Sequence, residues 1–566
     1  MKERMMPQFF KDIKGYNKGV FLKDLTAGII VGVVALPLAI AFGIASGVSP
    51  TEGLITAIVG GLIVSLFGGS KVQIGGPTGA FIVIVYGVIQ KFGIDGLALA
   101  TIMAGIMLMA LGLLRLGTMI KFVPYPIIVG FTAGIAITIF TTQIKDLFGL
   151  QVSDLPGDFL GKWSVYFEAM GTTSWLALLF GVLTVLIIVL TPRVNKNIPA
   201  SLLALVVLTI VSVVLGTIGV VRPENIGDRF TIEAGLPSLV FPEITIERLQ
   251  LLFPSAVTIA MLGAIESLLS ASVADGVIGA RHDSNQELVG QGIANLVVPF
   301  FGGIPVTGAI ARTMTNINSG GKTPVAGMIH AVVLLLIMLV LSPLTSHIPM
   351  AVLAGVLVVV SYNMSGWRSF VAIFKGPKGD AIVMVVTFLL TVLIDLTVAI
   401  GIGMIIAILI LLRRVLKASE INLVDPRHNH PEEPKLHLPK CVEVYEIDGP
   451  FFFGIANRFD ETMRSMNDNP HARIIRMRRV PFVDSTAIHN LKTMIELHRE
   501  SNTQVILSGV QPNVLETLRS AGVVDLLGAE NITPHIDLAQ KRAVEFVAEH
   551  YPLDYQKWKA HEDRQD

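Results

Sequence analysis

The amino-acid sequence predicts an all-α polytopic membrane protein followed by a small cytoplasmic α/β domain. Its 566 residues are 52% hydrophobic and only 15% charged, whereas soluble domains carry about a quarter charged residues. Apolar runs alternate with short polar breaks from Leu25 to about Leu416, and the composition becomes that of a soluble protein from Lys417 onward. Two short apolar segments with Pro and Gly at their start also lie at matching places in the two halves of the apolar region.

Run length predicts about fourteen membrane segments, in two inverted sets of seven. Lys and Arg are concentrated in every second polar break, which predicts that both termini of this multi-pass protein are cytoplasmic. We expect the protein in the cell (inner) membrane. We expect a cytoplasmic N-terminal segment (1–24), a membrane domain (25–416), a linker (417–439) and a soluble domain with its tail (440–566). The approximate segment centres are Val34, Val59, Ile84, Ala104, Gly134, Val185, Val207, Ala260, Ile293, Arg312, Leu335, Leu357, Val386 and Ile406.

Two stretches that contain a Thr-Gly-Ala sequence nearly repeat each other. The first is Gly75–Ala80 and runs into Phe81–Ile89; the second is Gly302–Ala309 and runs into Ile310–Ile317. Each covers roughly 17 Å from its Thr, whereas the hydrocarbon core is about 30 Å thick. Each is the third segment of its set, so we expect the two starts to approach the midplane from opposite sides. Because free amides at helix starts attract anions, the pattern indicates an anion carrier.

Candidate anion-binding residues lie at these two starts. Each Thr hydroxyl could donate to an anion or could cap a helix, and both interpretations stay open. Small side chains let a ligand reach backbone amides, whereas Phe81 fits the hydrophobic core as well as the cavity wall. The candidates are Thr78, Gly79, Ala80, Phe81, Thr307, Gly308, Ala309, Ile310 and Arg312.

Glu266 is a carboxylate at the centre of a long apolar helix, where an ionised group is costly and therefore suggests function. Burial lets such a carboxylate change its protonation state near neutral pH, and the hydroxyl of Ser270 lies four residues further on. A structural ion pair between Glu266 and Arg312 is the alternative. Arg312 would then supply positive potential to the anion, pair with the carboxylate, or do both.

The soluble tail alternates strand-like and helical patterns, which indicates a small α/β domain. Strands are expected at 441–447, 472–477 and 504–507. Helices are expected at 455–466, 485–499, 514–521 and 538–549.

Several of these motifs resemble the sulfate permease (SulP) family of anion transporters. The resemblance lies in Ala35–Ala41, Gly75–Ala80, Leu262–Leu269 and Gly308–Thr313, and the tail resembles the STAS domain that follows such transporters. It implies an inverted repeat of fourteen helices, a core and a gate domain, a homodimer and an elevator-like movement. It also implies that Glu266, with Ser270 nearby, serves ion coupling beside the anion site. Leu38 stands where sulfate carriers of plants and animals have Gln, and the sequence resembles most closely bacterial branches that move dicarboxylates or bicarbonate.

The STAS resemblance includes the loop Val483–Ala487, which is similar to the phosphorylated loop of anti-sigma-factor antagonists. Ser485 is therefore a candidate regulatory site, because a phosphate at a helix start is stabilised by the helix dipole. An ordinary N-cap is the alternative interpretation of Ser485. A cytoplasmic protein partner of this domain is a further expectation.

Together these features predict secondary-active transport of a small anion, which could be sulfate, bicarbonate or a C4-dicarboxylate, by proton symport through Glu266. The alternatives are a sodium-coupled bicarbonate symporter, a passive anion channel and a membrane-anchored STAS signalling module. Enzyme motifs such as a nucleophile elbow, a Walker loop or a dinucleotide fingerprint are not found. A net charge of +0 gives no case for nucleic-acid binding, and the single cysteine, Cys441, excludes a multi-cysteine metal site, so no cofactor beyond the coupling ion is expected.

Overall fold

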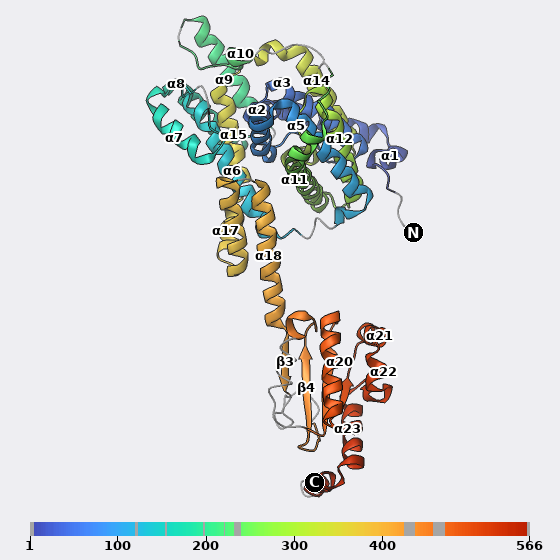
Figure 1. The fold of residues 1–566 in the computed structure, drawn as a ribbon. Coiled ribbons are helices and arrows are strands. Elements are labelled where there is room, and N and C mark those ends of the chain that lie inside the picture. Colours follow the sequence, from blue (N-terminus) through green and yellow to red (C-terminus); the bar gives the residue numbers. More distant parts are fainter. Residues whose placement is uncertain are drawn as a thin grey trace. The chain divides into compact units, whose positions relative to one another are not determined.

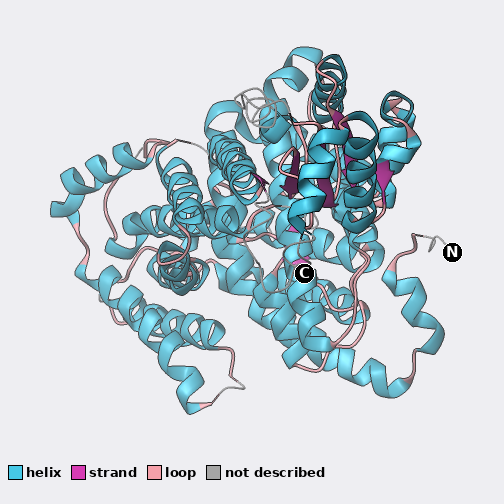
Figure 2. Ribbon diagram, turned by 90° about the horizontal axis from the view of Figure 1, so that it is seen from below, coloured by secondary structure: helices cyan, strands magenta, loops and turns pink. Residues whose placement is uncertain are grey.

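The computed structural model describes residues 5–118, 123–152, 155–195, 198–219, 221–230, 239–394, 396–423, 436–456 and 470–562. The chain forms two compact units, Met1–Ala407 and Ile408–Asp566. Helices make up most of the described chain (Figures 1 and 2).

The first half of the membrane unit is a series of apolar helices. A short helix α1 (Gln8–Asp12) precedes them. They are α2 (Lys18–Ala45), α3 (Pro50–Ile55), a π-helical turn (Thr56–Gly60), α4 (Gly61–Phe67), α5 (Ile82–Leu113), α6 (Tyr125–Phe148), α7 (Phe159–Ala169), α8 (Trp175–Val194) and α9 (Ala200–Thr217). Gly93 breaks α5 into two helical parts, because its φ of 73° and ψ of −178° are not helical.

The second half follows the same order after a short helix α10 (Ile226–Arg229). Its helices are α11 (Ile246–Ile278), α12 (Ser284–Val297), α13 (Ile310–Asn318), α14 (Val325–Thr345), α15 (Met350–Met364), α16 (Trp367–Phe374), α17 (Lys378–Leu393) and α18 (Leu396–Ala418). Every predicted segment centre lies within one of these helical elements. Among the described residues, nine helices are long and apolar enough to cross a membrane.

The helices pack in two groups. One, which we call the core group, contains α2, α3, α4, α5, α11, α12, α13 and α14; the other, the gate group, contains α6, α8, α9, α15, α16 and α17. Close packing within the core group depends on small residues. A methyl group on Gly105 of α5 would lie 2.7 Å from the carbonyl oxygen of Gly292 in α12, and the reverse distance is also 2.7 Å. The backbones of α5 and α12 therefore touch, and neither position has room for a side chain.

The second unit contains a five-stranded sheet in the order β3–β4–β5–β6–β7. β3 (Glu420–Leu423) is antiparallel to β4 (Val442–Asp448), whereas β5 (Ala472–Arg479), β6 (Gln504–Ser508) and β7 (Ile532–Thr533) continue in parallel. The helices are α20 (Ser485–Glu500), α21 (Pro512–Ser520), α22 (Val523–Leu527), α23 (Ile536–His550) and α24 (Pro552–Glu562).

The sequence predicted β4, β5, β6, α20, α21 and α23 to within two residues at each end. It missed the two edge strands β3 and β7. The helix expected at 455–466 lies mostly outside the described residues. Alternate side chains of the parallel strands enter two separate clusters: Tyr445, Ile475 and Leu507 pack in one, and Val444, Ile474 and Ile506 in the other.

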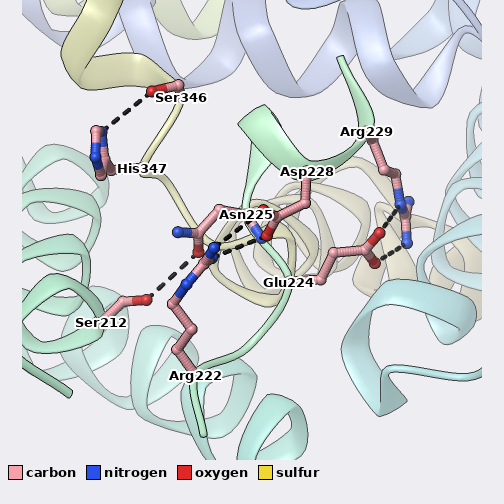
Figure 3. A network of polar contacts seen from close by, with 8 residues as sticks. All are labelled: Ser212, Arg222, Glu224, Asn225, Asp228, Arg229, Ser346 and His347. Atoms are coloured by element: carbon pink, nitrogen blue, oxygen red, sulfur yellow. Dashed lines mark hydrogen bonds and ion pairs between the residues drawn. The ribbon is translucent and has the colours of Figure 1, made fainter. Parts of the chain in front are cut away.

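A polar clasp joins two connections between the helix groups (Figure 3). The connection from α9 to α11 lies beside the turn from α14 to α15, and we define the clasp as residues 222–229 and 346–350. Three backbone hydrogen bonds link its parts: Ile226 N to Ile348 O (2.9 Å), Gly227 N to Ser346 O (2.8 Å) and Met350 N to Glu224 O (2.8 Å). Both connections run between the core and the gate group, so the clasp holds these two connections together.

Ion pairs fix the clasp. Arg229 donates to Glu224 (2.9 and 2.6 Å) and lies 2.7 Å from Asp146 at the end of α6 in the gate group. The guanidinium of Arg222 donates two hydrogen bonds to Asp228 and thereby lowers the pKa of that carboxyl below its ordinary value of 3.8. The stabilisation from ionised Asp228 is therefore present at neutral pH and is lost only as the pH falls through the lowered pKa.

The Arg229→Gln variant should unfold at a lower temperature than the unaltered protein. In this variant Glu224 loses two charged hydrogen bonds and Asp146 loses an ion pair, which costs roughly 1.5–3 kcal/mol of unfolding free energy. Thermal unfolding of the purified protein in detergent measures the shift. The control is Arg248→Gln, because Arg248 pairs at 3.6 Å with Glu243, whose side chain is 83% exposed. Equal shifts in the two variants would contradict the role of the clasp.

Candidate functional site

The two repeated stretches meet inside the core group. Strand β1 (Gly75–Gly76) pairs antiparallel with β2 (Thr307–Gly308), with Gly75 opposite Gly308 and Gly76 opposite Thr307. The N–H of Ala309 extends this pairing to the carbonyl oxygen of Ile74 (2.9 Å). A helix follows each strand: a 3₁₀ turn (Gly79–Phe81) leads into α5, and α13 begins at Ile310. The predicted meeting of the two starts is therefore observed.

Neither helix start is capped by a side chain. In the part of the chain that the structure describes, the N–H groups of Gly79 and Ala80 in the first start and of Ile310 in the second have no hydrogen-bond partner. By contrast, Gly308 donates to the Ser267 hydroxyl (3.1 Å), so neither its N–H nor that of Ala309 is available to a ligand. Free donors therefore lie at both starts, and they include those of Gly79, Ala80 and Ile310.

The two threonines attach the helix starts to α11. Thr78 donates its hydroxyl to Glu266 (3.3 Å). The Thr307 hydroxyl lies 2.8 Å from that of Ser267 and donates to the Gly263 carbonyl (3.2 Å), and the residue is fully buried. The capping interpretation is therefore wrong for both threonines. Thr307 also belongs to β2, three residues before α13, rather than to the helix itself.

Arg312 reaches from α13 to the first repeated stretch. Its side chain is only 2% exposed, and Nη2 donates to the Pro77 carbonyl. Gly76 has a φ of 149°, and a methyl group there would collide with Nη1 of Arg312. Nη1 itself is buried and has no partner among the described residues. The positive charge thus lies at the start of the first half-helix.

Glu266 lies beside Thr78 and remains partly exposed. Among the described residues no ion pair joins it to Arg312, so the ion-pair interpretation is wrong for this conformation. Ser270 is buried and donates to Thr313 of α13 (3.4 Å), whose hydroxyl oxygen also accepts the Ile74 N–H (3.1 Å). Ser270 therefore links α11 to α13 and is not hydrogen-bonded to Glu266 in this arrangement.

The first helix start lies where the two helix groups face each other. A methyl group on Gly79 would meet Sδ of Met364 from α15 at 2.8 Å and Cδ1 of Ile139 from α6 at 3.3 Å. Phe42 of α2 is next, at 3.6 Å. Phe81 is 1% exposed and packs toward α11, which favours its hydrophobic-core interpretation. Ala80 and Ala309 are also buried, whereas Ile310 is exposed.

Sequence reasoning missed Glu287, a fully buried carboxylate in α12. It accepts hydrogen bonds from the N–H groups of Gly69 (2.8 Å) and Ser70 (3.0 Å) and from the side-chain amides of Gln73 (2.8 Å) and Gln291 (2.9 Å). These bonds hold the turn that leads into β1. The only signal in the sequence was the four-residue spacing from Glu287 to Gln291, which places both on one helix face.

Asn295, one turn after Gln291, holds the second stretch in the same way. Its side chain donates to the Val306 carbonyl (2.8 Å) and accepts the Val306 N–H (2.8 Å). Residues of α12 therefore support both strands of the β1–β2 pairing, which we call the crossing.

In the second unit, Ser485 is the exposed first residue of α20. Asp484 is the N-cap: its carboxylate accepts the N–H groups of Ala487 (2.8 Å) and Phe453 (2.9 Å). The N-cap interpretation of Ser485 is therefore wrong.

The two groups of helices and the paired half-helix starts define a multi-pass membrane transporter. The sequence model described as the sulfate permease family matches residues 21–387, and the STAS domain model matches residues 435–539. The chain belongs to the sulfate permease family, which consists of anion transporters.

Individual relatives agree with this assignment. The Bacillus subtilis protein YvdB is 42% identical over 94% of this chain and 99% of its own length. The bicarbonate transporter BicA of Synechocystis is 34% identical over 94% of this chain and 96% of its own. The structure of the murine anion transporter Slc26a9 superposes with a TM-score of 0.84 at 20% identity, over 95% of this chain and 94% of that one, and shows that the fold is shared.

Replacing Gly76 by Ala should damage the crossing. The added methyl group meets Arg312 in a backbone conformation that costs of the order of 1–3 kcal/mol for a residue with a side chain. We expect a lower unfolding temperature and a loss of anion uptake by liposomes that contain the variant. Gly87→Ala is the matched control, because Gly87 in α5 has open space where the methyl group would go. Unchanged uptake by the Gly76 variant would show that the crossing tolerates displacement of Arg312.

Proposed function

We propose that the protein is a secondary-active transporter that binds a small anion in front of the two half-helices. The proposal rests on one observation: β1 and β2 pair so that two uncapped helix starts lie together. Backbone N–H groups at a helix start carry partial positive charge and bind anions. The free donors of Gly79, Ala80 and Ile310 would bind the anion, while Arg312 adds a full positive charge nearby.

The anion is a small oxyanion. Sulfate, bicarbonate and a C4-dicarboxylate all present oxygen acceptors to such donors. The family is named for sulfate and the Synechocystis relative for bicarbonate, and both names support this class of substrate. Thr78, Phe81, Thr307, Gly308 and Ala309 would act as the wall and support of the site through the contacts described above.

The movement we propose carries the core group past the gate group in an elevator-like manner. The first helix start contacts Met364 and Ile139 of the gate group, so the site lies at the boundary that such a movement would alter. Inverted repeats that place broken helices at the bilayer midplane support alternating access of this kind. We further propose a homodimer with both termini in the cytoplasm and Ser485 as a site of phosphorylation.

Glu266 would couple transport to protons. It is a carboxylate within a membrane helix, hydrogen-bonded to Thr78 at the first helix start, so its protonation state can alter the donor beside the anion. The contact between Glu266 and Thr78 is the observation that connects the coupling group to the site.

The Glu266→Gln variant should therefore bind anion but lose uphill uptake driven by a pH gradient. Uptake of a radiolabelled anion into liposomes, with and without the gradient, measures this difference. The control is Glu247→Gln, which removes an exposed carboxylate from the first turn of the same helix. If uphill uptake persists in the Glu266 variant, another group couples transport to the ion gradient.

Sodium-coupled transport of bicarbonate is the second candidate, and the relative BicA, which is named as a bicarbonate transporter, supports bicarbonate as the anion. Replacing sodium by choline outside the liposomes should leave uptake unchanged if protons drive it. A panel of sulfate, bicarbonate and succinate at pH 6 and pH 8 would identify the preferred anion. Uptake that requires sodium at both pH values would contradict proton coupling and support the sodium-coupled candidate.

A further inference from the structure

A pocket with three lysines among its lining residues lies at the start of α2, away from the residues that the proposed transport mechanism uses. Its volume is about 480 Å³, and four chain segments contribute to it: the residues before α2, the first turns of α2, the turn before β1 and the turn between α13 and α14. The lining residues are Asp12, Gly15, Tyr16, Asn17, Gly19, Val20, Lys23, Lys71, Lys322 and Thr323.

The lining of this pocket is positively charged. Lys23, Lys71 and Lys322 are exposed and come from three separate segments, whereas Asp12 is the one carboxylate among the lining residues. Asp12 lies 3.9 Å from the ammonium group of Lys71 and can neutralise only one of the three lysines. Two positive charges therefore remain without a partner of opposite sign in the lining.

A buried carboxylate fixes the shape of the pocket. Asp24 accepts hydrogen bonds from the N–H groups of Lys322 (2.7 Å) and Thr323 (3.2 Å), from the Thr323 hydroxyl (2.5 Å) and from the Tyr16 hydroxyl (3.1 Å). Its oxygens are thus occupied by the protein itself and face these donors. The bonds bring Lys322 and the segment that contains Tyr16 together, so the backbone that carries Lys322 is held against α2.

The pocket lies next to the start of the first membrane-spanning helix. It is formed immediately before the apolar run that starts at Leu25, and its lysines belong to the basic breaks. Residues at this position border the headgroup region, where basic side chains attract anionic lipids. The N-terminus of α2, a helix of 28 residues, adds partial positive charge to the same place.

We propose that this pocket binds a phosphate group, carried either by an anionic lipid headgroup or by a soluble organic phosphate. The three lysines outnumber the two carboxylates near them, Asp12 in the lining and Asp24 beside it, which leaves excess positive charge for a phosphate. The volume of the pocket exceeds what a single phosphate needs. Lys71 precedes β1 and Lys322 follows α13, so a phosphate held by both would touch the segment that leads into β1 and the turn that leaves α13.

The test is phosphate binding by the full-length protein in detergent, followed by thermal unfolding. Short-chain phosphatidic acid, glycerol phosphate and inorganic phosphate are titrated separately. We expect the unfolding temperature to rise with phosphate concentration until it saturates. The double variant Lys71→Gln, Lys322→Gln should bind roughly 30-fold more weakly, which corresponds to about 1 kcal/mol of binding free energy for each lysine. Saturation by phosphatidic acid alone assigns the site to lipid, and saturation by glycerol phosphate at similar concentrations assigns it to a soluble ligand.

The matched control is the double variant Lys375→Gln, Lys378→Gln. It removes two exposed lysines from the basic break between α16 and α17, and neither lines the pocket. Its affinity should equal that of the unaltered protein. Equal weakening in both double variants, or no stabilisation by any of the three phosphates, would overturn the proposal. This readout is independent of anion transport.

Discussion

A four-residue backbone pairing, Gly75–Gly76 against Thr307–Gly308, determines the centre of the membrane unit. Within a bilayer every unpaired peptide group is costly, so two helices can begin at depth only if the preceding residues find partners in the protein. The pairing satisfies part of this need. Backbone N–H groups in the turns and strand ends around it donate to the side chains of Glu287, Asn295, Ser267 and Thr313. This need explains why so many buried polar side chains surround two short strands.

The same constraint explains the roles of particular side chains. Arg312 donates to the Pro77 carbonyl at the end of the first strand, and Gly76 leaves room for its guanidinium. Thr78 and Thr307 both attach the helix starts to α11. The starts are therefore positioned by side-chain contacts from other helices, and their own first-turn amides are left to face a ligand.

The elements that could be predicted from the sequence are those marked by a pattern in neighbouring residues. The apolar runs around Val34 or Leu335, and the strand 504–507, follow from hydropathy and β-propensity alone, so their positions were predicted well. The crossing itself followed from the repeated Thr-Gly-Ala stretches. By contrast, the partner of Arg312, the role of Glu287 and the cap at Asp484 depend on which segments meet in space. Edge strands as short as β7 carry too few residues for a pattern.

A site built from peptide N–H groups keeps its hydrogen-bond donors through most amino-acid substitutions. The donors at Gly79, Ala80 and Ile310 belong to the main chain, and every amino acid except proline would supply them again. Genetic drift can therefore scarcely erase the attraction for anions, whereas it can readily reshape the room around it through Phe42, Ile139 and Met364. Descendants of a protein with this site should keep a general affinity for anions. Their substrate specificities should diverge through substitutions of the side chains that surround the site.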